Sequence, residues 1–267
     1  MIIDAHIHCS GEEKVDDVLR ALDHAAVDKA VVLAPFLNGR YSLHDSDSLR
    51  SANHYLSGLI AHHTDRLIGF AVINPSLDNA CEDLGDAYDA GLCGLKMVPT
   101  GWYPYDDCAH RVYETASHLK IPILFHSGIF IDGKSGRFCR PSFYEAIRDY
   151  PDLRVTLAHL GWPWSDEANA VGLIDLINGV PPDNSQFRFD ISFGAPPTYR
   201  LEVLRKALAV LTPGLLQFGS DVFLPCSGEL IKSRIDDVLE LFEHLDIDKH
   251  GRERIMGGTA AAWLGVN

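Results

Sequence analysis

Two histidines near the start of the chain, His6 and His8, have the spacing of a metal-binding pair. They lie in the apolar segment DAHIH. In a β-strand, side chains two residues apart point to the same face, with α-carbons about 6.5 Å apart. Two imidazoles on one face can bind a single ion at about 2.0–2.1 Å. The pair alone is only moderately specific, because such pairs also occur on ordinary surfaces.

Three further ionisable residues stand where apolar segments end. His126 follows ILF, His159 follows VTLA, and Asp221 closes QFGSD. A lone buried histidine is usually a hydrogen-bonded core residue, but packing does not explain the same arrangement at the end of several segments. In a parallel barrel, the carboxyl ends of the strands form the active face. We therefore expect these side chains to meet the histidine pair there.

Short apolar segments alternate with amphipathic ones along the whole chain. Eight segments are predicted as strands: Ile2–Ile7, Ala30–Ala34, Leu67–Ile73, Gly94–Val98, Ile121–His126, Arg154–Ala158, Phe187–Ser192 and Leu215–Gly219. Between them, helices are predicted over Val15–Ala26, Ser48–His62, Ala80–Ala90, Cys108–Leu119, Ser142–Asp149, Leu201–Val210 and Ile231–Glu243. Continuous apolar strands are typical of a parallel sheet covered on both faces.

Eight strand–helix units in 267 residues match the roughly 250 residues of a single barrel. We predict an α/β fold, a (β/α)₈ TIM barrel of the metal-dependent hydrolase type, as one domain over 1–267. The longer connections are Trp102–Asp107, Gly128–Pro141 and Asn178–Gln186. The first two follow strands four and five, so we expect them to contact the substrate.

Composition excludes several classes of function. The formal net charge is −14 and no basic stripe offsets it, which argues against a nucleic-acid partner. No segment reaches the roughly 20 apolar residues of a membrane span. The first residues, MIIDAHIHCS, do not resemble a secretion signal. We expect a cytoplasmic protein with a small-molecule substrate, and a homodimer is the working expectation for its assembly.

The chain resembles the amidohydrolase-related family, in the branch that contains aminocarboxymuconate-semialdehyde decarboxylase. The resemblance covers nearly the whole length and is far more specific than any single motif. It depends on DAHIH, PILFHSG, RPSFYEAIRDYPDLRVTLAHLGWPW, FRFDISF, LLQFGSDVF and IMGGTAAAWLGV. The chain departs from the family at Thr259-Ala260, where the family tends to have Asn-Ala.

The resemblance implies roles for the residues at the strand ends. It makes His6, His8, His126 and Asp221 the metal ligands, and Asp221 also the proton-transfer group. It implies that His159 faces the substrate or binds a second metal. Three imidazoles and a carboxylate suit Zn²⁺, with Mn²⁺ or Fe²⁺ as alternatives. One metal is favoured and two remain open.

Other candidate site residues come from the fourth strand and the loops. Lys96 could be a carboxylated lysine that bridges two metals, could pair with a substrate carboxylate, or could extend out of the barrel. Arg137 and Arg140 could bind a substrate carboxylate. An aromatic wall for a cyclic substrate is a further possibility, with lid packing as the alternative; its members are Trp102, Tyr103, Trp162 and Trp164.

Three functions remain open at this stage. The favoured one is a metal-dependent hydrolase of a small ester, lactone or amide, in which the metal activates water, Asp221 transfers the proton and His159 stabilises the developing oxyanion. The alternative is a non-oxidative decarboxylase of a small unsaturated or aromatic acid, which would use the same ligands. A catalytically silent barrel is the third. We favour hydrolysis because the chain is close to a minimal barrel, without an added segment for an elaborate aromatic-acid pocket.

Overall fold

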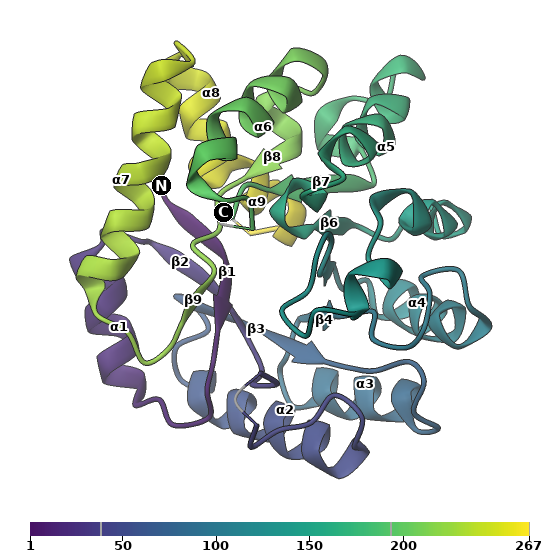
Figure 1. Cartoon of the computed structure of the whole chain (residues 1–267). Helices are drawn as coiled ribbons and strands as arrows, with labels where there is room; N and C mark the ends of the chain where they lie inside the picture. The colour runs from purple at the N-terminus through teal and green to yellow at the C-terminus, as the bar shows by residue number, and fades with distance from the viewer. Residues whose placement is uncertain (38, 193, 267) are drawn as a thin grey trace.

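A parallel sheet forms the centre of the molecule, and helices surround it (Figure 1). The structure is a computed structural model that describes residues 1–37, 39–192 and 194–266. Within these residues the strand order is β8-β7-β6-β5-β4-β3-β2-β1-β9, and every pairing is parallel. The strands are β1 (Ile3–His8), β2 (Lys29–Leu33), β3 (Leu67–Val72), β4 (Gly94–Met97), β5 (Ile123–Phe125), β6 (Val155–Leu157), β7 (Phe187–Asp190), β8 (Leu216–Gln217) and β9 (Val222–Phe223).

The eighth strand of the barrel is divided into β8, which lies within the predicted segment Leu215–Gly219, and β9, which lies beyond that segment, and together these close the barrel. β8 pairs with β7, whereas β9 pairs with β1. The amide of Asp221 also donates a hydrogen bond to the carbonyl of His6 at 2.8 Å. The division occurs because Asp221 has a left-handed backbone, φ 55°, which no extended strand can contain. The predicted barrel is therefore confirmed, with its last strand interrupted at a candidate site residue.

Helices follow most of the strands and pack their apolar faces on the sheet. The α-helices are α1 (Val15–His24), α2 (Ser46–Ile60), α3 (Ala80–Asp89), α4 (Asp107–Leu119), α5 (Ser165–Ile177), α6 (Pro197–Val210), α7 (Gly228–His244), α8 (Lys249–Glu253) and α9 (Thr259–Leu264). Shorter turns of helix are η1 (Ser135–Phe138), η2 (Pro141–Asp149), η3 (Ala158–Gly161), η4 (Pro182–Asn184), η5 (Pro213–Leu215) and η6 (Arg254–Gly258).

Several helical segments differ from the sequence-based expectation, and two of them lie between strands of the barrel. The segment predicted as a helix over Ser142–Asp149 is the 3₁₀-helix η2. Its buried residues Pro141, Tyr144 and Ile147 are three apart, which is the repeat of a 3₁₀-helix. α5 lies outside the predicted helices, because its apolar residues are not gathered on one face and the helical period is weak.

The ends of the chain meet at the amino end of the barrel. Ile3 and Ala5 of β1 pack with Ala260 of α9, and Trp263 of the same helix is buried against residues inside the barrel. Thr259 and Ala260, the departure from the family pattern, thus lie in the helix at the amino end of β1. The opposite end of β1 carries His8, so the candidate site lies at the carboxyl end of the barrel.

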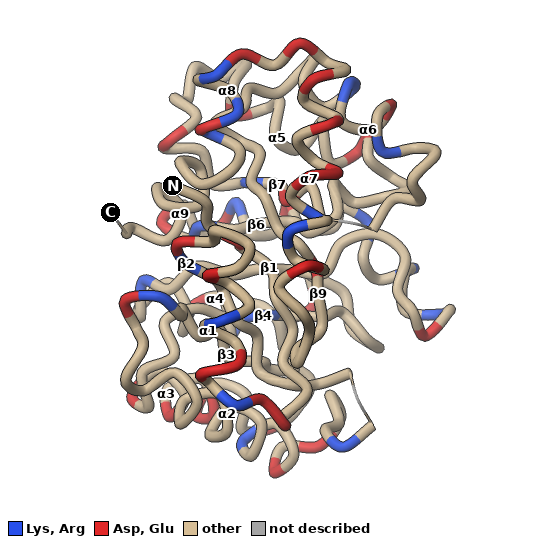
Figure 2. The backbone as a smooth tube through the Cα atoms, turned by 90° about the vertical axis from the view of Figure 1, so that its left-hand side faces the viewer, with Lys and Arg blue, Asp and Glu red and all other residues tan. Residues whose placement is uncertain are grey.

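Acidic residues are spread over the outer helices rather than collected in one patch (Figure 2). This distribution fits the net charge of −14. Among the described residues, no helix combines the length and apolar character that crossing a bilayer requires.

Candidate metal centre

His6, His8 and Asp221 place three metal-ligating atoms around one point. His6 Nε2 lies 3.1 Å from His8 Nε2. Asp221 Oδ1 lies 3.1 Å from His8 Nε2 and 3.5 Å from His6 Nε2. Donors around a tetrahedral Zn²⁺ at about 2.0–2.1 Å are themselves about 3.3 Å apart. The triangle of atoms therefore has the dimensions of one face of a metal coordination shell.

The imidazole of His6 is oriented by a buried carboxylate, Asp190, at the end of β7. His6 Nδ1 donates a hydrogen bond to Asp190 Oδ2 at 2.9 Å. Burial raises the pKa of Asp190, but the attraction and hydrogen bond of His6 outweigh burial and hold the pKa below its usual value. An ionised carboxylate can only accept, so Nδ1 carries the proton and Nε2 presents a lone pair to the triangle.

Asp190 had no role in the sequence-based prediction, although the same signal marks it. It ends the apolar segment FRFD, just as the other candidates end their strands. The structure also groups Asp190 with His6 and His159 within ligand-forming distance. Because the Nδ1 of His6 already binds Asp190, we interpret this second group as one that orients the imidazole of His6 and not as a second metal site.

His159 lies beside the triangle. Hydrogen bonds to the last residue of β7 and to a residue just after β7 hold it in place. Its amide donates to Asp190 Oδ1 at 2.8 Å, and its Nδ1 lies 2.8 Å from Ser192 Oγ. The same Nδ1 lies 4.0 Å from Asp221 Oδ2. Burial lowers the pKa of His159. Its backbone is left-handed, φ 61°, a conformation that aims the ring at the cluster at some cost in strain.

The protonation states of the side chains in the triangle favour the binding of a metal cation. Burial lowers the pKa of His8 to about 4, so this imidazole is neutral at pH 7. Burial raises the pKa of Asp221, but His6 and His8 outweigh burial and hold it well below the usual value. Neutral imidazoles and an ionised carboxylate are the forms that bind metal.

Lys96 of β4 points into the same cluster. Its Nζ lies 3.2 Å from His6 Nε2, and the residue is 1% exposed. Burial lowers the pKa of the ammonium group to about 8. The side chain is thus directed at the triangle rather than out of the barrel.

His126, the fourth predicted ligand, lies beside the triangle. Its ring centroid is 5.1 Å from that of His159. Its Nε2 lies 2.8 Å from the carbonyl oxygen of Ile129 and donates to it, so this nitrogen is not directed at His6, His8 or Asp221. Burial lowers its pKa well below the usual value. A ligand role for His126 stays a prediction.

The sequence model of the amidohydrolase family matches residues 3–266. The chain belongs to the amidohydrolase family. The resemblance that the sequence motifs carried is confirmed by this match. No match was found among curated proteins.

Solved structures share the fold of this amidohydrolase at low sequence identity. A 2,6-dihydroxybenzoate decarboxylase from Rhizobium has a TM-score of 0.71 at 15% identity, over 99% of this chain and 98% of that one. A 5-carboxyvanillate decarboxylase from Sphingomonas paucimobilis has a TM-score of 0.65 at 15% identity, over 100% and 99%. A probable 2-pyrone-4,6-dicarboxylic acid hydrolase from Acinetobacter baumannii has a TM-score of 0.65 at 16% identity, over 99% of both chains.

The predicted loop residues of this amidohydrolase occupy varied environments. Trp102 is 2% exposed within the main core. Trp162 packs near Tyr199, with ring centroids 6.1 Å apart. Tyr103 stacks on Tyr105. A substrate-binding role for the two tryptophans stays a prediction.

The two predicted arginines differ from one another. Arg140 forms an ion pair with Glu167 and lies over the ring of Trp164. Arg137 is exposed, and its guanidinium lies 4.8 Å from the centre of the Phe138 ring. Neither lines the triangle of ligating atoms. Carboxylate binding by Arg137 or Arg140 also stays a prediction.

Proposed function

We propose that the chain is a metal-dependent hydrolase of a small ester, lactone or amide, with Zn²⁺ held by His6, His8 and Asp221. One observation carries the proposal: the three ligating atoms lie 3.1–3.5 Å from one another, with one oxygen of Asp221 in the triangle and the other toward His159. A carboxylate arranged in this way can bind the metal through Oδ1 and accept a proton through Oδ2. The proposed partner is a small-molecule substrate.

Each residue has a role in this proposal. A bound divalent metal would polarise the substrate carbonyl and lower the pKa of water. Asp221 Oδ2 accepts the proton of the attacking water and returns it to the leaving group. His159 donates a hydrogen bond to the carbonyl oxygen as negative charge develops there. Asp190 keeps His6 in the tautomer that leaves Nε2 available.

Decarboxylation is the alternative, and Lys96 is the observation that favours it. An ammonium group within 3.2 Å of His6 Nε2 would attract a substrate carboxylate to the cluster. Two of the solved structures with this fold are decarboxylases. The same lysine would instead serve hydrolysis if it were carboxylated and bridged two metals.

Parallel product assays distinguish these functions. Purified protein loaded with Zn²⁺ is incubated with panels of lactones, esters and amides, followed by acid release, and with panels of aromatic and unsaturated acids, followed by CO₂ release. We expect acid release that a chelator abolishes and that added Zn²⁺ restores. Metal-dependent CO₂ release would establish the alternative. Turnover that survives complete metal removal would contradict both.

A further inference from the structure

A serine just after β7 contacts two of the groups that surround the candidate metal centre. Ser192 is 5% exposed and lies two residues after Asp190, the last residue of β7. Its hydroxyl oxygen contacts Asp190 Oδ1 and lies 2.8 Å from His159 Nδ1. One side chain thus connects the carboxylate that orients His6 with the imidazole that borders the triangle.

The direction of these hydrogen bonds follows from what Asp190 already accepts. Its Oδ1 accepts the backbone amides of His159 and Ser192, at 2.8 and 3.0 Å, and its Oδ2 accepts His6 Nδ1 at 2.9 Å. A carboxylate surrounded by donors acts only as an acceptor, so the hydroxyl of Ser192 donates to it. Because a hydroxyl has one hydrogen, the oxygen of Ser192 must accept its other hydrogen bond, from His159 Nδ1.

The tautomer of His159 follows from this chain of hydrogen bonds. Nδ1 carries a hydrogen, which it donates to Ser192, so Nε2 is the nitrogen that remains for the substrate. When Nε2 also donates, to a developing oxyanion, the ring carries a positive charge. The chain of hydrogen bonds ends at the carboxylate of Asp190, which stabilises that charge.

Packing holds the imidazole of His159 beside Ser192. A Cβ atom at Gly194 would lie 2.4 Å from the Cβ of His159 and 2.6 Å from its Cγ, so the backbone of Gly194 lies directly against this side chain. A cavity of about 30 Å³ is lined by His159, by Ser192 and by residues of α6 and α7 that include Leu204 and Leu241. A cavity of this size has room for about one water and is too small for an imidazole, so the ring cannot turn into it.

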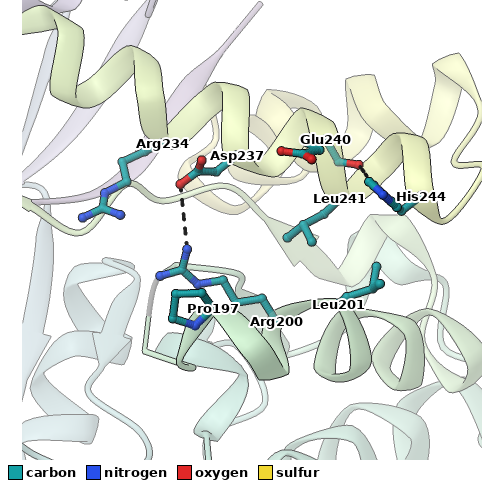
Figure 3. Close-up of a pocket in the computed structure, with 8 residues that line it drawn as sticks. All are labelled: Pro197, Arg200, Leu201, Arg234, Asp237, Glu240, Leu241 and His244. Atoms are coloured by element: carbon teal, nitrogen blue, oxygen red, sulfur yellow. Dashed lines mark hydrogen bonds and ion pairs between the residues drawn. The ribbon is translucent and has the colours of Figure 1, made fainter.

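The larger groove between α6 and α7 is separate from this arrangement. Figure 3 shows its walls, which come from both helices, and its volume is about 470 Å³. Neither His159 nor Ser192 lines it. We therefore attribute the orientation of His159 to Ser192 and Gly194 and not to this groove.

We propose that Ser192 is a positioning residue, which fixes a hydrogen on Nδ1 of His159 and keeps Nε2 for the substrate. Its hydroxyl acts through His159 and does not itself contact the reacting atoms. This inference rests on the proposed function for the role of Nε2, whereas the tautomer is a property of the protein without substrate.

Nitrogen NMR of the histidine side chains tests the inference without turnover. The sample is Zn²⁺-loaded protein labelled with ¹⁵N-histidine, above neutral pH, where the ring of His159 is neutral because burial lowers its pKa. His159→Asn identifies the signals of His159 by their loss. We expect a hydrogen on Nδ1 and none on Nε2. Ser192→Ala should change this pattern, because Nδ1 loses its acceptor, whereas Ser192→Thr keeps a hydroxyl and should keep the pattern.

Ser185→Ala is the matched control, because Ser185 makes the same kind of bond just before β7. It is 2% exposed, and its hydroxyl donates to the buried Asp175 at 2.5 Å. We expect both alanine variants to keep the wild-type affinity for Zn²⁺, measured by competition with a chromophoric chelator. Only Ser192→Ala should change the signals of His159 and, with a substrate, lower kcat about 10–100-fold at a nearly unchanged KM.

Three results would overturn the inference: no hydrogen on Nδ1 in the wild type, identical His159 signals in the wild type and Ser192→Ala, or an equal change in Ser185→Ala. If Ser192→Ala does not fold, the wild-type pattern and its retention in Ser192→Thr decide the question. The expected pattern without turnover of any substrate would contradict the proposed function and leave this inference standing. Turnover by an enzyme without a hydrogen on Nδ1 would do the reverse.

Discussion

The chemistry of the candidate centre depends on which nitrogen each imidazole presents. His6 binds Asp190 through Nδ1 and therefore offers Nε2, whereas His126 directs Nε2 to a backbone carbonyl. Two histidines with the same sequence signal thus differ in what they can ligate. The difference comes from hydrogen-bond partners that the strand-end signal does not specify.

Asp190→Asn tests whether Asp190 holds His6 in the tautomer that binds metal. The amide keeps the shape of the carboxylate but loses its charge, so the tautomer of His6 is no longer enforced. We expect Zn²⁺ affinity, measured by competition with a chromophoric chelator, to fall about 10–100-fold. An unchanged affinity would contradict the role of Asp190.

Asp175→Asn is the control for Asp190→Asn, because Asp175 is also a buried acid. It pairs with Arg148 at 2.6 Å and accepts hydrogen bonds from Ser185 and Gln186. We expect this variant to lower the free energy of unfolding by about 1–3 kcal/mol while Zn²⁺ affinity stays unchanged.

His159→Asn separates catalysis from metal binding. His159 borders the triangle but is not one of its three members. We expect kcat to fall about 10²–10³-fold, since a hydrogen-bond donor to the developing oxyanion is lost, while metal content stays at the wild-type value. Loss of the metal in this variant would instead make His159 a ligand.

The candidate site was predictable where a residue ends an apolar strand. His6, His8 and Asp221 carry that signal, and the structure brings them together. Asp190 carries the same signal but lacks the recognisable spacing of a pair, so its role emerged only from its contact with His6.

At the scale of elements, the active face depends on loops that turn sharply. The loop after β5 begins near Gly128, whose φ is 101°. A Cβ at this position would lie 2.1 Å from the carbonyl oxygen of Trp162, in the loop after β6. The two loops that follow His126 and His159 are therefore packed backbone to backbone.

Gly128→Ala tests this contact, with Gly101→Ala as the matched control. Gly101 has a similar φ of 89°, but a methyl group added there would have no neighbouring atom within 4 Å among the described residues. The left-handed backbone costs about 1–2 kcal/mol in either variant. Gly128→Ala should lose about 1–3 kcal/mol more through overpacking, measured by urea unfolding. Equal losses in the two variants would contradict the tight loop contact.

Glu13 connects the loop between β1 and α1 to α2 through hydrogen bonds. It accepts hydrogen bonds from the amide of Gly11 at 3.0 Å and from the hydroxyl of Tyr55 at 2.7 Å. Burial raises the pKa of Glu13, but hydrogen bonds from Ser10 and Tyr55 outweigh burial and lower it below 4.5. A lowered pKa in the folded state means that the ionised form stabilises the fold.

Glu13→Gln should therefore destabilise the protein in a pH-dependent way. The contribution of Glu13 is complete above its unfolded pKa of 4.5 and is lost as the pH falls through the lower folded value. We expect Glu13→Gln to lower the free energy of unfolding by about 1–3 kcal/mol at pH 7. The difference in the free energy of unfolding between Glu13→Gln and the wild type, measured by chemical denaturation, should become smaller below pH 4.5. A gap that is constant with pH would contradict this account.

The barrel was predictable from the sequence because its signal repeats. Apolar segments of strand length alternate with amphipathic ones, and each strand predicted from them is present in the described residues. The interruption of the last strand was not predictable, because the left-handed backbone of Asp221 reflects how β9 meets β1 rather than a local preference.

For the whole molecule, fold and ligands do not determine the reaction. Decarboxylases and a probable hydrolase share this architecture at 15–16% identity. The difference between such enzymes must come from the groups around the substrate, and Lys96 and His159 are the proposed groups in this chain. Specificity was therefore the part of the function that the sequence left open.

The most direct test of the account is the position of the metal, from anomalous X-ray scattering at the zinc edge on crystals grown with Zn²⁺. We expect one strong peak at about 2.0–2.2 Å from His6 Nε2, His8 Nε2 and Asp221 Oδ1. Its distance to His126 will decide whether that residue joins the shell. A fully soaked crystal without a peak at the triangle, or with the metal bound elsewhere, would contradict the central claim.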